Sequence, residues 1–380
     1  MGKTKNLLKD LKDLTVRGGR VAENLKEILW DFVEEQYIQI IQLELLGDLV
    51  EEIYLLDKAE NDNYRSIRAL VEDPTTSPET FEKLAENKDP IVRRIVAENL
   101  NTNIPSDILE KLAKRLAEDK SWFVRAALAE NSNLPPDIFR KLAEELAKDP
   151  DWRVRAALAE NDNTPPDILG KLAEDEYWSV RAEAAENPNT PQDKLRKLVK
   201  DSNPLVRAAL AENSNISAED LWQLAKDSYL NVRVAVARYL SIHFRIPPEM
   251  REELAKRLAK DKYWRVRAAL AEGSNIPVIL WWSARDKDPR VREKAAGNSH
   301  TPPQALGELA EDPNPDVRAA DARNYNTPPD ILYWWSARDK DPRVRLFAAL
   351  NRSTPLKGRV ELTRDRDPDV RNVAMRNIIP

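Results

Sequence analysis

The chain of 380 residues contains no cysteine and only two histidines, His243 and His300. The lack of cysteine excludes disulfides, thiolate nucleophiles and cysteine-bound zinc or iron–sulfur centres, and it agrees with a cytoplasmic location. The histidines lie far apart in the sequence, which disfavours a histidine-based metal site or catalytic triad. Acidic residues are abundant, but most occupy helix-capping positions, so no pair stands out as an acid–base dyad. We therefore expect no metal, no cofactor and no catalytic residue.

Long apolar stretches are also absent. The most apolar run, YIQIIQLELLGDLV, is interrupted by Gln, Glu and Asp and is too short to span a bilayer. The start, MGKTKNLLKDLKDL, lacks the apolar centre of a secretory signal. The 60 Lys and Arg nearly balance the 65 Asp and Glu, for a net charge of −5, which argues against a generally basic nucleic-acid-binding surface. These features favour a protein partner over nucleic acid and predict no membrane partner.

Helix-forming residues dominate, and one pattern repeats along most of the chain. The pair Val-Arg recurs every 25 to 27 residues, apart from three longer intervals of 30 to 34. Its arginines are Arg93, Arg125, Arg155, Arg181, Arg207, Arg233, Arg267, Arg292, Arg318, Arg345 and Arg371, with a degenerate first copy at Arg68. Each longer interval contains about one extra helical turn. A fixed period of this size predicts an all-α solenoid, in which each unit buries its apolar face against its neighbours.

Each unit contains signals for two helices. Asp or Asn followed by Pro precedes the Val-Arg pair, which predicts an N-cap and a first-turn proline. Six residues after the arginine comes Asn or Gly, such as Asn161, a residue type that tolerates the left-handed conformation ending a helix. The sequence NTPPD then restarts the chain, with Thr164 as the expected cap of a second helix.

The unit VRAALAENDNTPPDILGKLAED resembles the leucine-rich repeat variant (LRV), which is similar in appearance to HEAT repeats. The resemblance covers about residues 64–380, or about twelve repeats. It implies a right-handed α-solenoid in which an α-helix alternates with a shorter, often 3₁₀, helix. The best-known LRV protein carries a cysteine-ligated iron–sulfur module, which this cysteine-free chain cannot reproduce. HEAT repeats also use an Asp–Arg ladder, so the resemblance implies that the repeated arginines bind the Asp of DPRVR in a neighbouring repeat.

The first 63 residues lack the repeat pattern. They read as one or two longer amphipathic helices, which we expect to form a helical cap on the solenoid. A separate pair of docking helices is the alternative for this segment.

Function in a solenoid is expected where exposed positions depart from the repeat. The first departure replaces the proline that opens the first helix with Trp122, Trp152, Trp178 and Trp264. Packing of each ring on the preceding helix is the favoured interpretation, and contact with a partner is the alternative.

The second departure affects the second helix of C-terminal units. Aligned on the following Asp, Trp281 and Trp334 replace Gly170, while Ser283 and Ser336 replace the core residue Leu172. The aromatic set is Trp222, Trp281, Trp282, Tyr333, Trp334 and Trp335. Either the helix has rotated and the indoles are core, or they form an exposed patch.

The third departure is a stripe of glutamates, each five residues after a repeated arginine. Its members are Glu98, Glu130, Glu160, Glu186, Glu212 and Glu272. Carboxylates in the last turn of a helix oppose its dipole, which suggests either inter-repeat salt bridges, the favoured reading, or an acidic track.

Together these features predict a non-enzymatic scaffold for protein–protein interaction. The partner is expected to contact some of the tryptophans, while a basic segment follows the acidic track. The alternative is a HEAT-like DNA-binding protein or DNA glycosylase-like enzyme, a family that combines aromatic, acidic and basic residues on a concave face. No motif matches that family residue by residue, and the acidic stripe disfavours phosphate binding.

Overall fold

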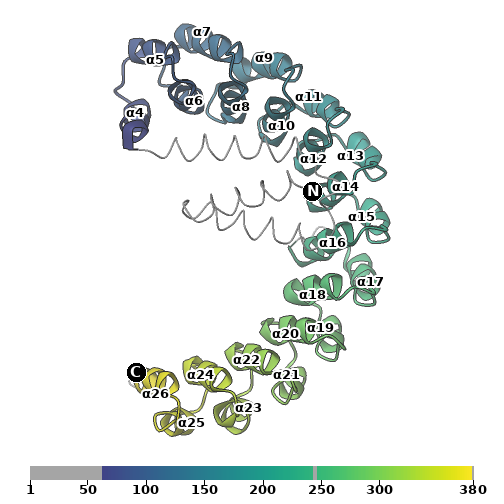
Figure 1. The fold of residues 1–380 in the computed structure, drawn as a ribbon. Helices are drawn as coiled ribbons and strands as arrows, with labels where there is room; N and C mark the ends of the chain where they lie inside the picture. Colours follow the sequence, from purple (N-terminus) through teal and green to yellow (C-terminus); the bar gives the residue numbers. More distant parts are fainter. Residues whose placement is uncertain (1–61, 243–245, 379–380) are drawn as a thin grey trace, which may run out of the picture. The chain divides into compact units, whose positions relative to one another are not determined.

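A computed structural model describes residues 62–242 and 246–378 (Figure 1). The described part consists of α-helices and one 3₁₀ helix, joined by turns, without strands. The chain is an α-solenoid, as the repeat period predicts. The expected cap over residues 1–63 falls outside the described residues, except for the start of helix α4 (Asp62–Glu72). Within the described ranges, no helix is both long and apolar enough to cross a membrane.

The chain divides into two units, residues 1–146 and 147–380. Helix α6 of the first unit packs against α4, α5 and α8, while α7 packs against α5, α8 and α9. The bounds after α4 are α5 (Pro78–Ala85), α6 (Pro90–Asn99), α7 (Ser106–Ala117), α8 (Trp122–Glu130) and α9 (Pro136–Leu146).

The second unit has two rows of helices. Its first helices are α10 (Trp152–Glu160), α12 (Trp178–Glu186), α14 (Pro204–Glu212), α16 (Leu230–Ile242), α18 (Trp264–Gly273), α20 (Pro289–Gly297), α22 (Pro315–Arg323), α24 (Pro342–Leu350) and α26 (Pro368–Ile378). Its second helices are α11 (Pro166–Leu172), α13 (Gln192–Leu198), α15 (Ala218–Leu224), α17 (Pro248–Leu258), α19 (Pro277–Ser283), α21 (Pro303–Leu309), α23 (Pro329–Trp334) with the 3₁₀ helix η2 (Ser336–Arg338), and α25 (Leu356–Leu362). Within this unit the first helices form the inner row in Figure 1 and the second helices the outer row.

Helix starts and lengths follow the sequence signals. The side chains of Asp288 and Asn203 accept hydrogen bonds from the backbone nitrogens two residues later, and prolines open both helices, as predicted. The long intervals give second helices of 12, 11 and 11 residues (α7, α9 and α17), against seven in α11, which is about one extra turn. The second helices are mostly α-helical rather than 3₁₀, with η2 as the exception among the described residues.

The arginine ladder is confirmed, but with a different aspartate from the one expected. Arg267 donates two hydrogen bonds to Asp286, not to Asp288 of the Asp-Pro pair, which instead caps its own helix. The equivalent pairs are Arg93–Asp119, Arg155–Asp175, Arg181–Asp201, Arg207–Asp227, Arg233–Asp261, Arg292–Asp312, Arg318–Asp339 and Arg345–Asp365. The ladder aspartate lies two positions before the Asp-Pro aspartate, in the turn after the second helix, and its carboxylate accepts from both the arginine and the backbone N–H two residues later.

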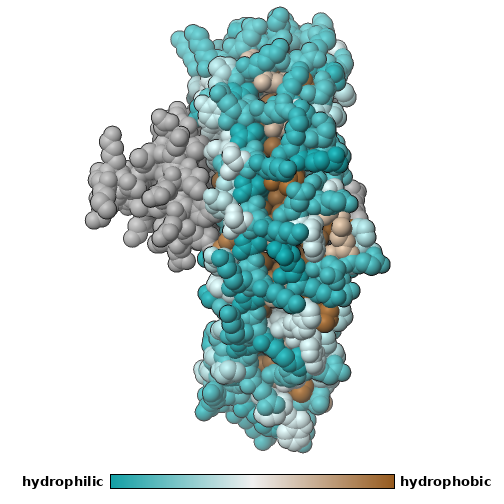
Figure 2. Space-filling view, turned by 90° about the vertical axis from the view of Figure 1, so that its right-hand side faces the viewer, coloured by the Kyte–Doolittle hydropathy of each residue, from teal (hydrophilic) through white to brown (hydrophobic). Residues whose placement is uncertain are grey.

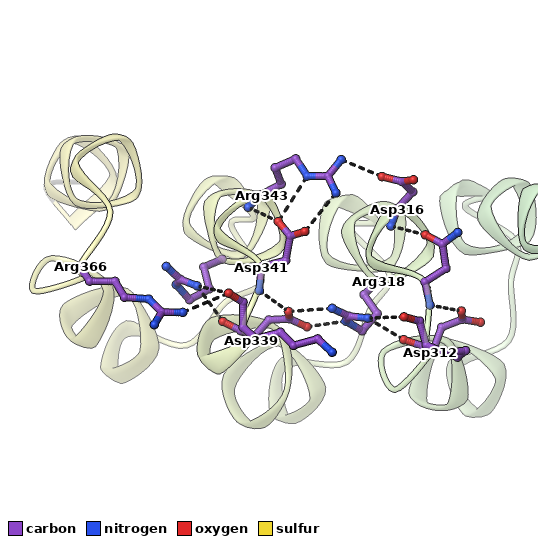
Figure 3. A network of polar contacts seen from close by, with 11 residues as sticks. Asp312, Asp316, Arg318, Asp339, Asp341, Arg343 and Arg366 are labelled. Atoms are coloured by element: carbon purple, nitrogen blue, oxygen red, sulfur yellow. Dashed lines mark hydrogen bonds and ion pairs between the residues drawn. The ribbon is translucent and has the colours of Figure 1, made fainter.

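The ladder is continuous because each aspartate also binds the arginine of the next repeat. Asp339 accepts from Arg318 through its carboxylate, and its backbone oxygen accepts from Arg345 (Figure 3). Asp312 and Arg318 are linked in the same way through the backbone oxygen of Asp312. Buried bidentate pairs of this kind fix the relative orientation of adjacent repeats.

The expected role of the asparagines is wrong. Asn213 has φ −66° and ψ 122°, an extended rather than a left-handed conformation, and the other asparagines that follow first helices of this unit are similar. Its buried side chain donates to the backbone oxygens of Ala185 and Asn187 in the preceding repeat and accepts from the backbone N–H of Asn215. The asparagines therefore form a second ladder that binds carbonyl groups at the end of the neighbouring helix.

Thr164 does not cap the second helix as expected. Its hydroxyl donates to the backbone oxygen of Leu158 in the first helix, and Thr190, Thr301 and Thr354 make the same contact in their repeats. The proline after the threonine, Pro165 in this unit, occupies the cap position. The threonine thus closes the turn between the two helices of one repeat.

Candidate functional site: partner-binding surfaces

Three tryptophans of the C-terminal second helices are exposed rather than core. Trp282, Trp334 and Trp335 expose 40%, 62% and 46% of their surface, while Ser283 and Ser336 are buried. The serines therefore occupy the core positions of the repeat, and the helices have not rotated to bury the indoles. Figure 2 looks onto the side where the second helices of this unit lie, and that side is hydrophilic apart from small separate hydrophobic patches.

Trp281 is half-buried and belongs to an ordered contact. It packs against the core of its repeat, and the guanidinium carbon of Arg285 lies 3.7 Å from its ring centre. Arg285 also donates to the backbone oxygen of Trp281 and forms an ion pair with Glu308 of the next second helix. This arginine covers the indole and links adjacent repeats.

Tyr333 is only 8% exposed, so for this member of the aromatic set the core alternative holds. It takes the place of Trp281: Arg338 lies 4.1 Å from its ring centre and donates to its backbone oxygen, and both side chains bind Glu361. The alignment on the following Asp hid this equivalence because the later repeat has one extra residue. The insertion ends α23 at Trp334 and turns the chain into η2.

The tryptophans that open first helices are all half-buried. Trp264 packs against the core, with Arg290 of the next repeat 3.6 Å from its ring centre. Trp152 stacks on Tyr177 at 6.2 Å between ring centres. Trp122 makes an edge contact with Phe123, and Trp178 is half-buried like the others. Packing is thus the observed role of Trp264 and Trp152, although toward the following repeat and not the preceding helix.

The glutamate stripe divides into paired and unpaired members. Glu98 forms ion pairs with Arg94 and Arg68, and Glu272 pairs with Lys294, as the salt-bridge interpretation predicts. Glu130 is exposed at the end of α8.

The remaining members, Glu160, Glu186 and Glu212, form no ion pair with any described residue. Glu183 lies among them, on α12, at a position where the neighbouring repeats have alanine. Burial raises the pKa of Glu183 to about 7, with a further contribution from Glu160 and Glu186. Burial also raises the pKa of Glu186, helped by Glu212 and Glu160. These four residues define an acidic cluster on α10, α12 and α14.

Sequence reasoning missed Glu183, although its column could have revealed it. The position two residues after the repeated arginine is Ala157 in the preceding unit and Ala209 in the following one. A carboxylate in this column points to a local requirement that the scaffold does not share.

The two predicted surfaces lie on different rows of the second unit. The acidic cluster lies on first helices, in the inner row, whereas the exposed tryptophans lie on second helices, in the outer row (Figure 1). The structure therefore does not bring them together into one site. No group of three or more acidic or histidine residues in the described ranges is placed to hold a metal ion.

Comparison with known proteins supports the repeat assignment. The model of the leucine rich repeat variant family matches residues 152–176 and 289–314. No curated protein matches the chain. Similar solved structures include YibA from E. coli, with 15% identity over 84% of this chain and 97% of that chain and a TM-score of 0.34. Kap121p, crystallised bound to Nup53p, has 13% identity over 93% of this chain and 48% of that chain, with a TM-score of 0.33.

Proposed function

Because the chain is an α-solenoid with leucine-rich repeat variant units, we propose that it is a cytoplasmic scaffold that binds a protein partner through its exposed tryptophans. The supporting observation is the exposure of Trp282, Trp334 and Trp335 beside serines that fill the core. Exposed indoles leave apolar area in contact with water, and burying that area against a partner is favourable. Tryptophan is also among the residues that most often dominate binding energy at protein interfaces.

The acidic cluster is a second candidate contact, for a basic segment. Glu160, Glu183, Glu186 and Glu212 repel one another, and the raised pKa of Glu183 reflects this together with burial. Lysine or arginine side chains of a bound segment would relieve the repulsion. Because this cluster lies on the inner row, it serves a different segment from the one that contacts the tryptophans.

The test is a comparison of variants in a binding experiment. The triple variant Trp282→Ser, Trp334→Ser, Trp335→Ser is compared with Tyr325→Ser, because Tyr325 is exposed but lies outside the aromatic set. Partners recovered by wild type are titrated against both purified variants. We expect the triple variant to lose at least about 2 kcal/mol of affinity and Tyr325→Ser to bind as wild type. Equal binding by all three proteins would refute the role of the tryptophans.

Nucleic acid is the competing ligand, and the same preparation tests it. Duplex DNA is titrated at low and at moderate salt. Tight, salt-sensitive binding of the unmodified protein would overturn the scaffold proposal in favour of the DNA-binding alternative.

A further inference from the structure

An open groove of about 640 Å³ lies between the second helices α15 and α17. One wall carries Trp222, and the remaining lining is rich in cationic side chains. These cations are Lys226, Arg233, Lys256, Arg257, Lys260 and Lys262. The size is in the range of ligand sites, but the open form suits an extended segment better than an enclosed small molecule.

The groove lies between two second helices that no side-chain ion pair among the described residues bridges, unlike some other neighbouring pairs of second helices. Lys194 and Lys197 bind Glu174 across α11 and α13, and Arg285 binds Glu308 across α19 and α21. Between α15 and α17 the described side chains form no such ion pair. Lys256, which lies there, bonds to glutamates of its own helix. The two helices are therefore not joined by a side-chain ion pair on this surface.

The acidic residues of the groove are already neutralised. Asp227 is bound by Arg207, and Asp261 is bound by Arg233, as members of the arginine ladder. Glu253 is paired with Lys256. The carboxylates in the lining therefore leave the other cations unbalanced.

Four exposed cations have no carboxylate partner among the described residues. They are Lys226, Arg257, Lys260 and Lys262. Arg257 has only a long hydrogen bond, 3.3 Å, to the backbone oxygen of Ala225. The groove thus carries a local positive charge on a chain whose net charge is −5.

Aromatic faces accompany these cations. The Lys226 ammonium lies 4.9 Å from the ring centre of half-buried Trp222. The Lys260 ammonium lies 6.0 Å from the ring centre of Trp282 on α19, which extends the cationic surface toward the exposed tryptophans. A ligand therefore meets positive charge and an indole face side by side.

We propose that this groove binds an acidic peptide segment that also carries an aromatic or aliphatic side chain. The carboxylates of the segment pair with Lys226, Lys260 and their neighbours, and its apolar side chain covers Trp222. Glu252 and Glu253 on α17 share the single cation Lys256, so one negative charge remains beside the groove. A phosphate backbone is charged at every position and meets this charge, whereas a peptide can place a neutral residue there. This site goes beyond the proposed contact of the exposed tryptophans and does not depend on it.

The proposal is tested with a short fluorescein-labelled peptide of glutamates interspersed with phenylalanine, followed by fluorescence anisotropy. We expect saturable binding that weakens with salt, and no binding of the same peptide with lysine in place of glutamate. The double variant Lys226→Glu, Lys260→Glu should lose at least about tenfold in affinity. Trp222→Ala should weaken binding at unchanged salt dependence.

Matched controls keep this test specific. The variant Lys171→Glu, Lys200→Glu makes the same charge change at exposed lysines outside the groove, and we expect it to bind nearly as wild type. Trp334→Ser, Trp335→Ser should also bind the peptide normally, so failure of the aromatic contact is distinguishable from failure of the groove. Equal losses in the groove variant and the lysine control would overturn the proposal. So would tighter binding of oligodeoxythymidine than of the peptide, abolished by the same groove variants.

Discussion

Arg155 binds the carboxylate of Asp175 through two hydrogen bonds, from Nε at 2.7 Å and from a terminal nitrogen at 2.9 Å. Its other terminal nitrogen donates to the backbone oxygen of Asp149 at 2.7 Å. This one side chain thereby binds two successive aspartates, Asp149 and Asp175, which occupy equivalent positions in the repeat pattern. Because the ladder repeats this geometry, the arginines are structural and are not available to read a ligand.

Loss of Arg155 should destabilise the protein far more than loss of Arg153. Arg155→Ala leaves the buried Asp175 carboxylate without its cation, which typically costs about 3–5 kcal/mol. Arg153 is partly buried and pairs with Asp151 of its own repeat, so we expect Arg153→Ala to cost about 1 kcal/mol or less. Urea denaturation followed by circular dichroism measures both. Equal shifts would contradict the structural role of the ladder.

Replacement of Asn213 tests why asparagine recurs at the end of the first helices: for its side-chain hydrogen bonds to the preceding repeat, or for a left-handed backbone conformation. Asn213→Ala leaves the backbone oxygens of Ala185 and Asn187 without their donor, which costs about 1–3 kcal/mol for buried groups. Asn213→Gly should be at least as destabilising, because the residue has φ −66° and needs no left-handed freedom. A glycine variant as stable as wild type would restore the left-handed interpretation. Thermal melting of the two variants measures this difference.

The solenoid was predictable because its signals are local. The Asp-Pro caps and the Val-Arg period report contacts within one helix or one repeat, and the structure confirms them. Asn213 was misread because its partners lie 26 and 28 residues away, where propensity carries no information. Tyr333 was misplaced because one inserted residue shifted its register, and only the packed structure shows which side chain Arg338 covers.

Asp321 should make stability fall as pH rises. It occupies a core column that holds leucine at Leu158 and Leu210, it is fully buried, and Oδ2 has no hydrogen-bond partner. Burial raises its pKa to about 8, partly offset by a hydrogen bond from Thr327.

The sign follows from proton binding. The folded state holds the proton of Asp321 more tightly than the unfolded state, whose carboxyl has an ordinary pKa near about 4. The stabilisation is full below about pH 4 and is lost as pH rises toward 8. Asp321→Asn removes this dependence, and it should be more stable than wild type by on the order of a few kcal/mol at pH 8. Unfolding free energies of the two proteins across this range measure it, and parallel curves would show that Asp321 does not titrate in the folded state as described.

Glu183 should link binding of a basic segment to pH. Its pKa of about 7, raised first by burial and then by Glu160 and Glu186, means that the carboxyl is about half protonated near neutral pH. A bound lysine or arginine favours the ionised form of Glu183, so binding of a lysine-rich peptide should release a proton from this carboxyl group. The affinity for the peptide should therefore increase as pH rises from 6 to 8. Glu183→Ala, which restores the residue of the neighbouring repeats, should weaken this binding and flatten its pH dependence. The variant should also stabilise the free protein at pH 8, because the repulsion between Glu183 and its acidic neighbours is removed.

Isothermal titration calorimetry in buffers of different ionisation enthalpy counts the released proton. Glu272→Ala is the control, because Glu272 is already paired with Lys294. Binding that is independent of pH in the wild type would exclude Glu183 from the contact.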